Sequence, residues 1–341
     1  MTDLTSTYLG LSLTGPVIAS ASPLTGRVET LRQLEAAGAS AAVLPSLFEE
    51  ELVNEELSMH EALEQGTNSF AESLDFFPHT DFYDIGPERH VRLVEEAKRA
   101  LTIPVIASVN AAHPGSWKRY TTMMADAGAD AIELNVYAMA TDRSVGAADV
   151  ETSYLEIIRE VREAVRVPLA VKLSPFYSSV AHLSRQFDNE GIDGIVLFNR
   201  FYQPDFDIRG EVKLSKKLNL STSEELPQRL RWVAALYGRL RASLAITGGI
   251  HTGDDVIKAV LAGADVVQVV SAIIQHGPKR LTVIRTEMEQ WMGLHTPGTL
   301  DSIRGALSLQ KVLNREHYDR VNYIGILRDA AMGIVERAAK K

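Results

Sequence analysis

The sequence predicts an α/β protein built as a single TIM (β/α)8 barrel, and two repeated features carry this prediction. Four times, a helical stretch ends at a glycine and a short apolar run follows. These glycines are Gly38, Gly128, Gly191 and Gly263. Glycine tolerates the left-handed conformation that ends a helix, and a β-branched apolar run suits a buried parallel strand. Twice more, a proline ends a helical stretch and begins a strand, at Pro104 and Pro168.

Eight strands and eight helices alternate along the chain. The strands are expected to begin near Val17, Ala41, Val105, Ala131, Leu169, Gly194, Leu244 and Val266. The helical patterns cover 28–38, 87–101, 116–128, 151–166, 178–190, 227–241, 252–262 and 279–292. Eight βα units fit a closed barrel better than an open doubly wound sheet, and no G-x-G-x-x-G follows the first strand as the open sheet usually requires.

We expect one domain over residues 1–341, with the barrel at about 15–295 and a charged helical extension at about 296–341. Two long loops follow the second and sixth strands, over 46–86 and 200–225, and a hairpin-like piece is expected at 212–219. Both loops leave the carboxyl end of the barrel, where the active sites of this fold are built.

The composition indicates a metabolic enzyme of the cytoplasm. A chain of 341 residues with 45% hydrophobic residues can bury a large core, and a net charge of −9 argues against a nucleic-acid partner. The absence of cysteine excludes disulfides, iron–sulfur ligation and thiolate catalysis by this chain. No signal-peptide pattern or membrane-length apolar run is present, so we expect no membrane association.

Small and polar residues stand where the predicted strands end, which is where a barrel places its chemistry. In chain order these residues are Ala19, Ser20, Ser46, Asn110, Asn135, Lys172, Asn199, Gly248, Gly249, Val270 and Ser271. Small residues after the first strand let a flat ligand lie close to the backbone, although they also fit a simple tight turn. An Asn135 amide can pair with a heterocycle, or alternatively with the backbone of a loop.

Lys172 lies within an apolar strand, and a buried ammonium group requires a partner. That partner is an anionic ligand or, alternatively, Glu133 on the neighbouring strand. Gly248 and Gly249, together with backbone N–H groups after the eighth strand, match the recurrent phosphate site of this fold. A flat, phosphorylated ligand beside a buried cation indicates FMN, whose reduced form Lys172 would stabilise electrostatically.

These strand-end residues, with Glu133-Leu134-Asn135, Val171 to Pro175 and Thr247 to Ile250, together resemble the dihydroorotate dehydrogenase family over about residues 8–290. The resemblance implies an FMN-dependent oxidation of a CH–CH bond in a small polar, cyclic or carboxylated substrate, with dihydroorotate and pyrimidine biosynthesis as candidates. It implies a catalytic group of Lys172, Asn135 and Asn199. The FMN would contact Ala19, Ser20, Ser46, Asn110, Asn135, Lys172, Gly248, Gly249, Val270 and Ser271. A homodimer and an electron-acceptor partner protein are also implied.

The chain departs from the family pattern at the proton-transfer position. Ala138 stands where the family carries a Cys or Ser base, and Pro45 stands where a Lys usually precedes Ser46. The asparagine-rich substrate loop is not found in 66–80. A missing general base costs on the order of 10²–10⁴ in rate. The candidate replacement bases are Tyr137, His113, Asp142 and Ser144.

Two other functions remain open. A flavin-binding protein without dehydrogenase activity, such as an accessory subunit or sensor, would explain the changes at Ala138 and Pro45. A flavin-free sugar-phosphate enzyme would use Lys172 as a Schiff-base amine. No metal site is expected, because His79 and Asp81 have no second histidine at ligand spacing.

Overall fold

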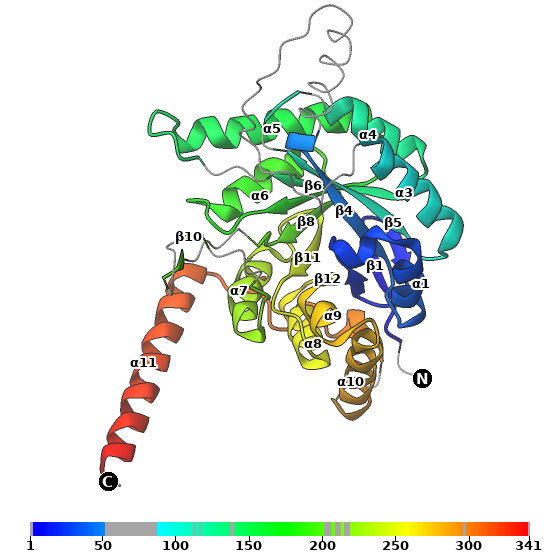
Figure 1. Ribbon diagram of the computed structural model, residues 1–341. Helices are drawn as coiled ribbons and strands as arrows, with labels where there is room; N and C mark the ends of the chain where they lie inside the picture. The colour runs from blue at the N-terminus through cyan, green and yellow to red at the C-terminus, as the bar shows by residue number, and fades with distance from the viewer. Residues whose placement is uncertain are drawn as a thin grey trace, which may run out of the picture.

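The computed structural model describes residues 3–51, 87–111, 113–115, 117–136, 140–200, 206–208, 213–214, 219–295 and 298–339. Eight parallel strands close into a barrel that helices surround, which confirms the predicted TIM fold (Figure 1). The strands in barrel order are β11 (Ser243–Thr247), β12 (Val266–Val269), β3 (Val17–Ala19), β4 (Ala42–Phe48), β5 (Val105–Ala111), β6 (Ala131–Val136), β7 (Leu169–Leu173) and β8 (Gly194–Leu197).

The eight helices that the sequence predicts are all present. They are α1 (Val28–Ala36), α3 (Pro87–Ala100), α4 (Trp117–Asp126), α5 (Ala147–Ala164), α6 (Val180–Asn189), α7 (Leu226–Leu236), α8 (Gly253–Ala262) and α10 (Arg280–His295). The four glycines that end helices all have positive φ, as expected from the repeated phrase. A short helix that was not predicted, α9 (Ser271–His276), follows β12 directly.

A hairpin at the start of the chain closes the amino end of the barrel. It is formed by β1 (Ser6–Tyr8) and β2 (Leu11–Leu13), neither of which was predicted. Tyr8 and Leu9 pack in the inner core of the barrel with Ala170 of β7 and Val196 of β8. The Leu9 backbone N–H donates to Ser243 Oγ at 3.3 Å. The amino end of the barrel is thus filled by protein.

Strand β4 changes register at its proline. β4 pairs with β5 through Ala42 and Val43, and the pairing shifts before it resumes at Ser46. Pro45 has no backbone N–H to donate, so a regular ladder cannot continue through it. The strand nevertheless extends to Phe48, beyond its expected end at Ser46.

The loop after β8 contains two short antiparallel strands, β9 (Phe206–Asp207) and β10 (Lys213–Leu214). The hairpin therefore begins earlier than the piece expected at 212–219. The loop expected at 46–86 lies outside the described residues beyond 51. Helix α11 (Arg315–Ala339) runs away from the barrel (Figure 1). Among the described residues, no helix combines the length and the apolar character needed to cross a membrane.

Candidate active site

A hydrogen-bonded group of three polar side chains lies across β4, β5 and β6 near their carboxyl ends. Asn135 Nδ2 donates to Ser46 Oγ at 3.1 Å and to Ser108 Oγ at 2.9 Å. The two serine hydroxyls are 2.8 Å apart. Asn135 Nδ2 also donates to Val109 O at 3.3 Å, and the amide oxygen Oδ1 is an acceptor suited to a donor of a bound ring. The structure thus brings Asn135 and Ser46 into direct contact and adds Ser108, a residue that was not predicted from the sequence.

Asn110 is the neighbour of this group on β5. It lies opposite Phe48 on β4 and opposite Asn135 on β6, and it is half-buried. Ala19 ends β3 and is fully buried, and its N–H donates to Ala41 O at 3.0 Å. Both residues therefore lie at the carboxyl ends of their strands, as predicted.

A second hydrogen-bonded network of buried polar side chains crosses the barrel and includes Lys172. Lys172 Nζ lies 3.3 Å from Glu133 Oε1 on the adjacent strand, so the alternative partner considered for this lysine is present. Gln268 Nε2 donates to the other oxygen of Glu133, and Ser20 Oγ donates to Gln268 Oε1 at 2.9 Å. Lys172, Glu133, Gln268 and Ser20 thus connect β7, β6, β12 and the end of β3.

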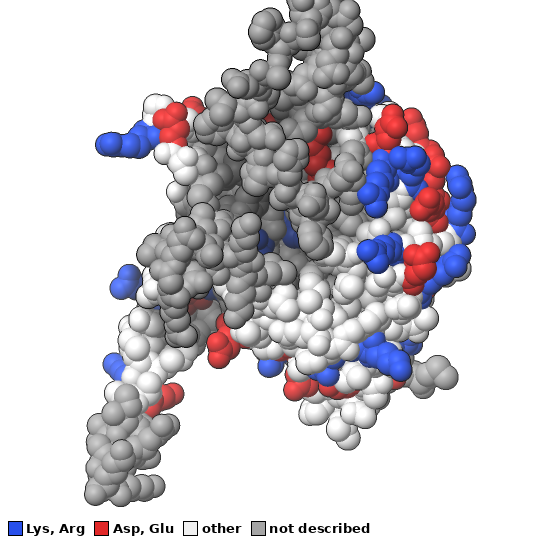
Figure 2. All heavy atoms as spheres, viewed as in Figure 1, with Lys and Arg blue, Asp and Glu red and all other residues white. Residues whose placement is uncertain are grey.

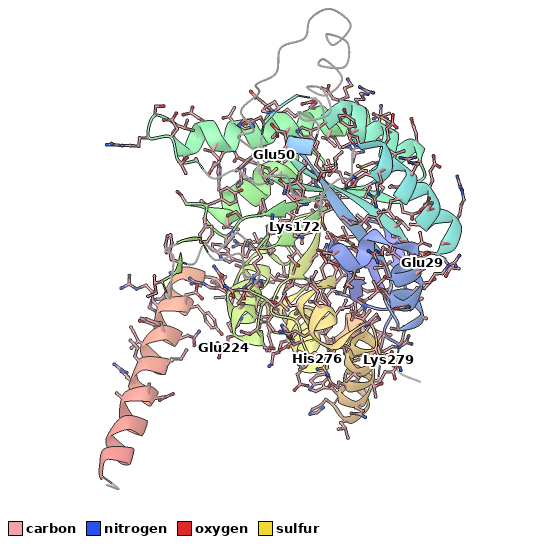
Figure 3. All side chains as sticks on the ribbon, in the orientation of Figure 1. Glu29, Glu50, Lys172, Glu224, His276 and Lys279 are labelled. Carbon is pink, nitrogen blue, oxygen red and sulfur yellow. The ribbon has the colours of Figure 1, made fainter. Side chains whose placement is uncertain are left out.

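The position of Lys172 keeps it available to a ligand as well as to Glu133. Lys172 is next to last in β7 and lies opposite Asn135 in the strand register. Figure 3 shows it at the centre of the barrel, whereas Glu29, Glu224, His276 and Lys279 lie at the periphery. In the same orientation, Figure 2 shows Lys or Arg atoms near the centre of this face. An ammonium group has three donors, and Glu133 uses one of them.

The turn after β11 and the start of α9 bring backbone N–H groups and buried hydroxyls together in a closely packed turn. Gly248 and Gly249 have φ of +83° and +82°. A Cβ at Gly249 would lie 2.7 Å from the Leu226 backbone nitrogen. Gly249 N donates to Ser221 Oγ at 3.3 Å, and Ser221 Oγ is 2.9 Å from Ser271 Oγ. Buried hydroxyls and backbone N–H groups beside a glycine turn fit a phosphate.

Ser221 was missed by the sequence analysis because it lies in the long loop after the sixth strand, far from any strand end. Its backbone N–H also donates to Ser271 Oγ, at 3.0 Å. Val270 lies between β12 and α9 and has non-helical backbone angles, so the chain turns there into the helix. Asn199 is held by its backbone N–H, which donates to Leu173 O at 2.7 Å. The contacts of the described residues do not connect the Asn199 side chain to the other predicted site residues.

The candidate replacement bases are either outside the described residues or engaged elsewhere. Tyr137 lies outside the described residues, as does Ala138, the position at which the usual base is missing. His113 Nδ1 lies 2.9 Å from Glu49 Oε1. Ser144 Oγ donates to Asp142 Oδ1 at 2.7 Å, and hydrogen bonds from Ser144 lower the pKa of Asp142, which makes that carboxylate a weaker base.

Glu51 is a titratable group at this end of the barrel that the sequence analysis did not single out. It follows β4 by one helical turn, and both of its carboxyl oxygens are buried. Burial raises the pKa of Glu51 to about 7; the Phe48 backbone N–H opposes this shift, and Glu50 adds to it. In the sequence, Glu51 looks like one member of the acidic run Glu49 to Glu51, which is typical of an exposed segment. Nothing in the sequence therefore marks it as a buried group.

Comparison with known proteins gives one consistent result. The family model for dihydroorotate dehydrogenase matches residues 83–292. A dihydroorotate dehydrogenase B (NAD(+)) catalytic subunit of Thermoplasma volcanium is 26% identical over 283 residues, which is 81% of this chain and 89% of that protein. The corresponding Endomicrobium trichonymphae subunit is 30% identical over 55% of this chain, and the match spans 62% of that subunit, less than two thirds. A putative dihydroorotate dehydrogenase A (fumarate) of Aeropyrum pernix is 27% identical over 66% of this chain and 70% of that protein.

Proposed function

The chain belongs to the dihydroorotate dehydrogenase family, and we propose that it is an FMN-dependent oxidoreductase acting on a CH–CH bond of a small polar substrate. The observation that carries this proposal is the pairing of two features at one end of the barrel. One is the Gly248–Gly249 turn with its buried hydroxyls, and the other is the Asn135 and Lys172 pair on adjacent strands. A phosphate fits the first, and a hydrogen-bonding ring fits the second.

Different residues of this chain would bind the phosphate and the ring of FMN. The turn at Gly248 and Gly249, with Ser271 and the preceding Val270, would hold the phosphate. Ser46 and Asn135 would contact the ring, with Ala19, Ser20 and Asn110 along the same strand ends. When bound, FMN supplies a two-electron acceptor for the substrate.

Lys172 supplies positive charge beside the ring position. Its ammonium group is held between β6 and β7 by Glu133, and Glu133 is itself fixed by Gln268. A prearranged cation stabilises negative charge that develops nearby during reaction without a reorganisation cost. Asn199, at the end of β8, would orient the substrate together with Asn135.

Dihydroorotate is the candidate substrate, with pyrimidine biosynthesis as the setting, because the relatives are named for its oxidation. The relatives are named as NAD(+)-linked and fumarate-linked enzymes, so we propose an electron acceptor, a partner protein or a small molecule, for this chain as well. A homodimer in the cytoplasm completes the proposal; light scattering of the purified chain tests the dimer.

A second candidate function is favoured by the residues at the proton-transfer position. Ala138 and Pro45 remove a base and a cation that family members usually carry, so a flavin-binding protein without dehydrogenase activity is the alternative. The sugar-phosphate alternative is less well supported. It needs Lys172 as a free amine, whereas its nitrogen is engaged by Glu133 at 3.3 Å.

The test begins with the absorbance spectrum of the purified chain and its uptake of added FMN. A chain that takes up FMN supports the proposal, and a colourless chain that binds none contradicts it. Gly249→Ala should abolish uptake, because the new Cβ meets the Leu226 backbone at 2.7 Å. Gly277→Ala is the matched control: its φ is also positive, at +76°, but no atom lies within 4 Å of the new Cβ.

Anaerobic titration of the FMN-loaded chain with dihydroorotate then separates the two candidates. Bleaching of the flavin absorbance supports the dehydrogenase. Binding of dihydroorotate without bleaching, in a chain that dithionite still reduces, favours the flavin-binding protein without dehydrogenase activity. Trapping of a sugar phosphate on Lys172 with borohydride would instead support the Schiff-base enzyme.

A further inference from the structure

A charged cluster lies beside the glycine turn, where the chain leaves β8 and where α7 begins. Arg200 directly follows Asn199, and Glu225 ends a short 3-10 turn before α7. Arg200 Nη2 lies 3.3 Å from Glu225 Oε1, and Arg229 Nη2 lies 3.3 Å from Glu225 Oε2. One carboxylate is therefore shared by two guanidinium groups.

Arg229 is fixed by further bonds and packs against the turn. Its Nε donates to Thr247 O and its Nη1 donates to Glu225 O, both at 2.6 Å. A Cβ at Gly248 would lie 2.8 Å from Arg229 Nη2. Burial lowers the pKa of Arg229, Glu225 opposes this shift and the charge of Arg200 adds to it, so the two cations repel each other. The guanidinium group of Arg229 is thus occupied by Glu225 and by the Thr247 carbonyl at the turn.

Arg200 keeps donor capacity that the described part of the chain does not use. Among the residues that the structure describes, Arg200 Nε is buried and has no hydrogen-bond partner. Within the same residues, Glu225 is the only carboxylate within 4.0 Å of either arginine. Arg200 and Arg229 carry two positive charges and Glu225 carries one negative charge, so the three side chains together have a net charge of +1. A buried guanidinium N–H without an acceptor is costly, and an oxyanion would satisfy both the donor and the charge.

We propose that Arg200 binds an oxyanion at the mouth of the barrel, supplied by the carboxylate of the substrate or the phosphate of the cofactor. This inference rests on the proposed function. Glu225 is then a positioning residue, which holds the guanidinium through Nη2 and leaves Nε toward the ligand. With the carboxylate as the source, the substrates of this chain are small carboxylic acids.

The experiment compares Arg200→Gln and Arg200→Lys with the wild-type chain. Arg159→Gln is the matched control, because Arg159 also pairs with one glutamate, Glu190, but lies in α5 outside the barrel. One arm measures the affinities of FMN and riboflavin, which differ by the phosphate. A second arm measures the affinity of orotate against that of uracil, which lacks the carboxylate. A third arm, which needs no flavin, measures the rise in unfolding temperature with orotate and with inorganic phosphate.

If the carboxylate is the source, Arg200→Gln should weaken orotate binding about 10- to 100-fold and leave uracil and FMN unchanged. If the phosphate is the source, FMN should weaken by the same factor and riboflavin should not. Arg200→Lys should lose less, because it keeps the charge. Arg159→Gln should change none of the affinities by more than about twofold and should leave the shifts in unfolding temperature as in the wild type.

Two results would overturn the inference. One is an Arg200→Gln chain that folds and binds FMN, orotate and phosphate like the wild type. The other is a wild-type chain that prefers neither orotate to uracil nor FMN to riboflavin. A wild-type chain that takes up no flavin contradicts the proposed function instead, and in that case stabilisation by orotate or phosphate that depends on Arg200 still supports the oxyanion site.

Discussion

At the scale of single residues, the side chain of Lys172 is nine-tenths buried, and one carboxylate balances its charge. Glu133 is itself buried, and the Gln268 amide fixes its other oxygen. Because both charges have left water, the pair contributes little net stability as a pair, but either member alone would be an uncompensated buried charge. Lys172 therefore has a structural role as well as its proposed role beside the ring.

We expect Lys172→Met to lower the free energy of unfolding by about 3–5 kcal/mol, because it leaves the Glu133 charge unpaired. The double variant Lys172→Met with Glu133→Gln should recover a large part of this loss. Denaturant unfolding of the wild type, the single variant and the double variant measures these changes in the free energy of unfolding. Removing the exposed Arg99 partner of Glu95 is the control and should cost no more than about 1 kcal/mol. A double variant no more stable than Lys172→Met would contradict this account of the pair.

Glu51 predicts a particular dependence of stability on pH. Its pKa is about 7 in the folded chain and 4.5 for an ordinary glutamate, so the folded state binds the proton more tightly. Its contribution to stability is therefore complete below about pH 4.5 and is lost as the pH rises through about 7. The difference in unfolding free energy between wild type and Glu51→Gln should fall over this interval. Glu29→Gln, at an exposed site on α1, should give a flat difference, and a flat result for Glu51 would refute the shift.

At the scale of elements, four of the helices end at a glycine with positive φ. α8 ends at Gly263, which has φ of +117°, and the ring of Tyr237 lies against it. α6 is followed by Gly191, which has φ of +79° and open space around it. The same sequence phrase is thus used in two surroundings, and only one of them is closely packed.

Replacing each glycine by alanine separates backbone strain from packing. Gly191→Ala should cost about 1–2 kcal/mol, the strain of a left-handed residue that carries a Cβ. Gly263→Ala should cost more, because its Cβ would collide with the Tyr237 ring. Thermal or denaturant unfolding measures both. Equal losses would show that Tyr237 moves aside freely.

The sequence predicted the barrel elements well because each leaves a local signal. The glycine and proline phrases mark where helices end and strands begin, and all eight predicted helices and strands are present. The β1–β2 hairpin was missed because strands of three residues have too little alternation to recognise. The register shift at Pro45 depends on pairing with β5, which is not a local property.

The site was predicted less completely, because its contacts join distant strands. Asn135 and Ser46 could be selected as strand-end polar residues, but their link through Ser108 requires the register of three strands. Ser221 lies in a loop and reaches Ser271 only in the folded chain. The Lys172 and Glu133 pair could be named as an alternative because the two residues were expected on neighbouring strands.

At the scale of the whole molecule, the C-terminal extension has two parts with different relations to the barrel. The first part, 298–313, is bonded to it: the N–H groups of Gly305, Leu307 and Leu309 donate to carbonyls of α8 and α7. Leu300 and Ile303 are buried there. The second part, α11, runs away from the barrel, and its large side chains Tyr323 and Ile326 are more than half exposed.

Two truncations should therefore differ sharply. Ending the chain after Asn314 removes α11 and an exposed ion pair from Arg231 to Asp319, so the free energy of unfolding should change by no more than about 1 kcal/mol. Ending it after His295 also removes the buried Leu300 and Ile303, each of which stabilises the fold by about 1.5–3 kcal/mol, and should lower the stability by several kcal/mol. Denaturant unfolding of both truncated chains measures the difference. FMN uptake by each chain tests whether the proposed binding site at the barrel mouth is intact. A large loss on removing α11 alone would mean that this helix packs against protein in solution, and light scattering of the full-length chain would then show whether a second copy provides that surface.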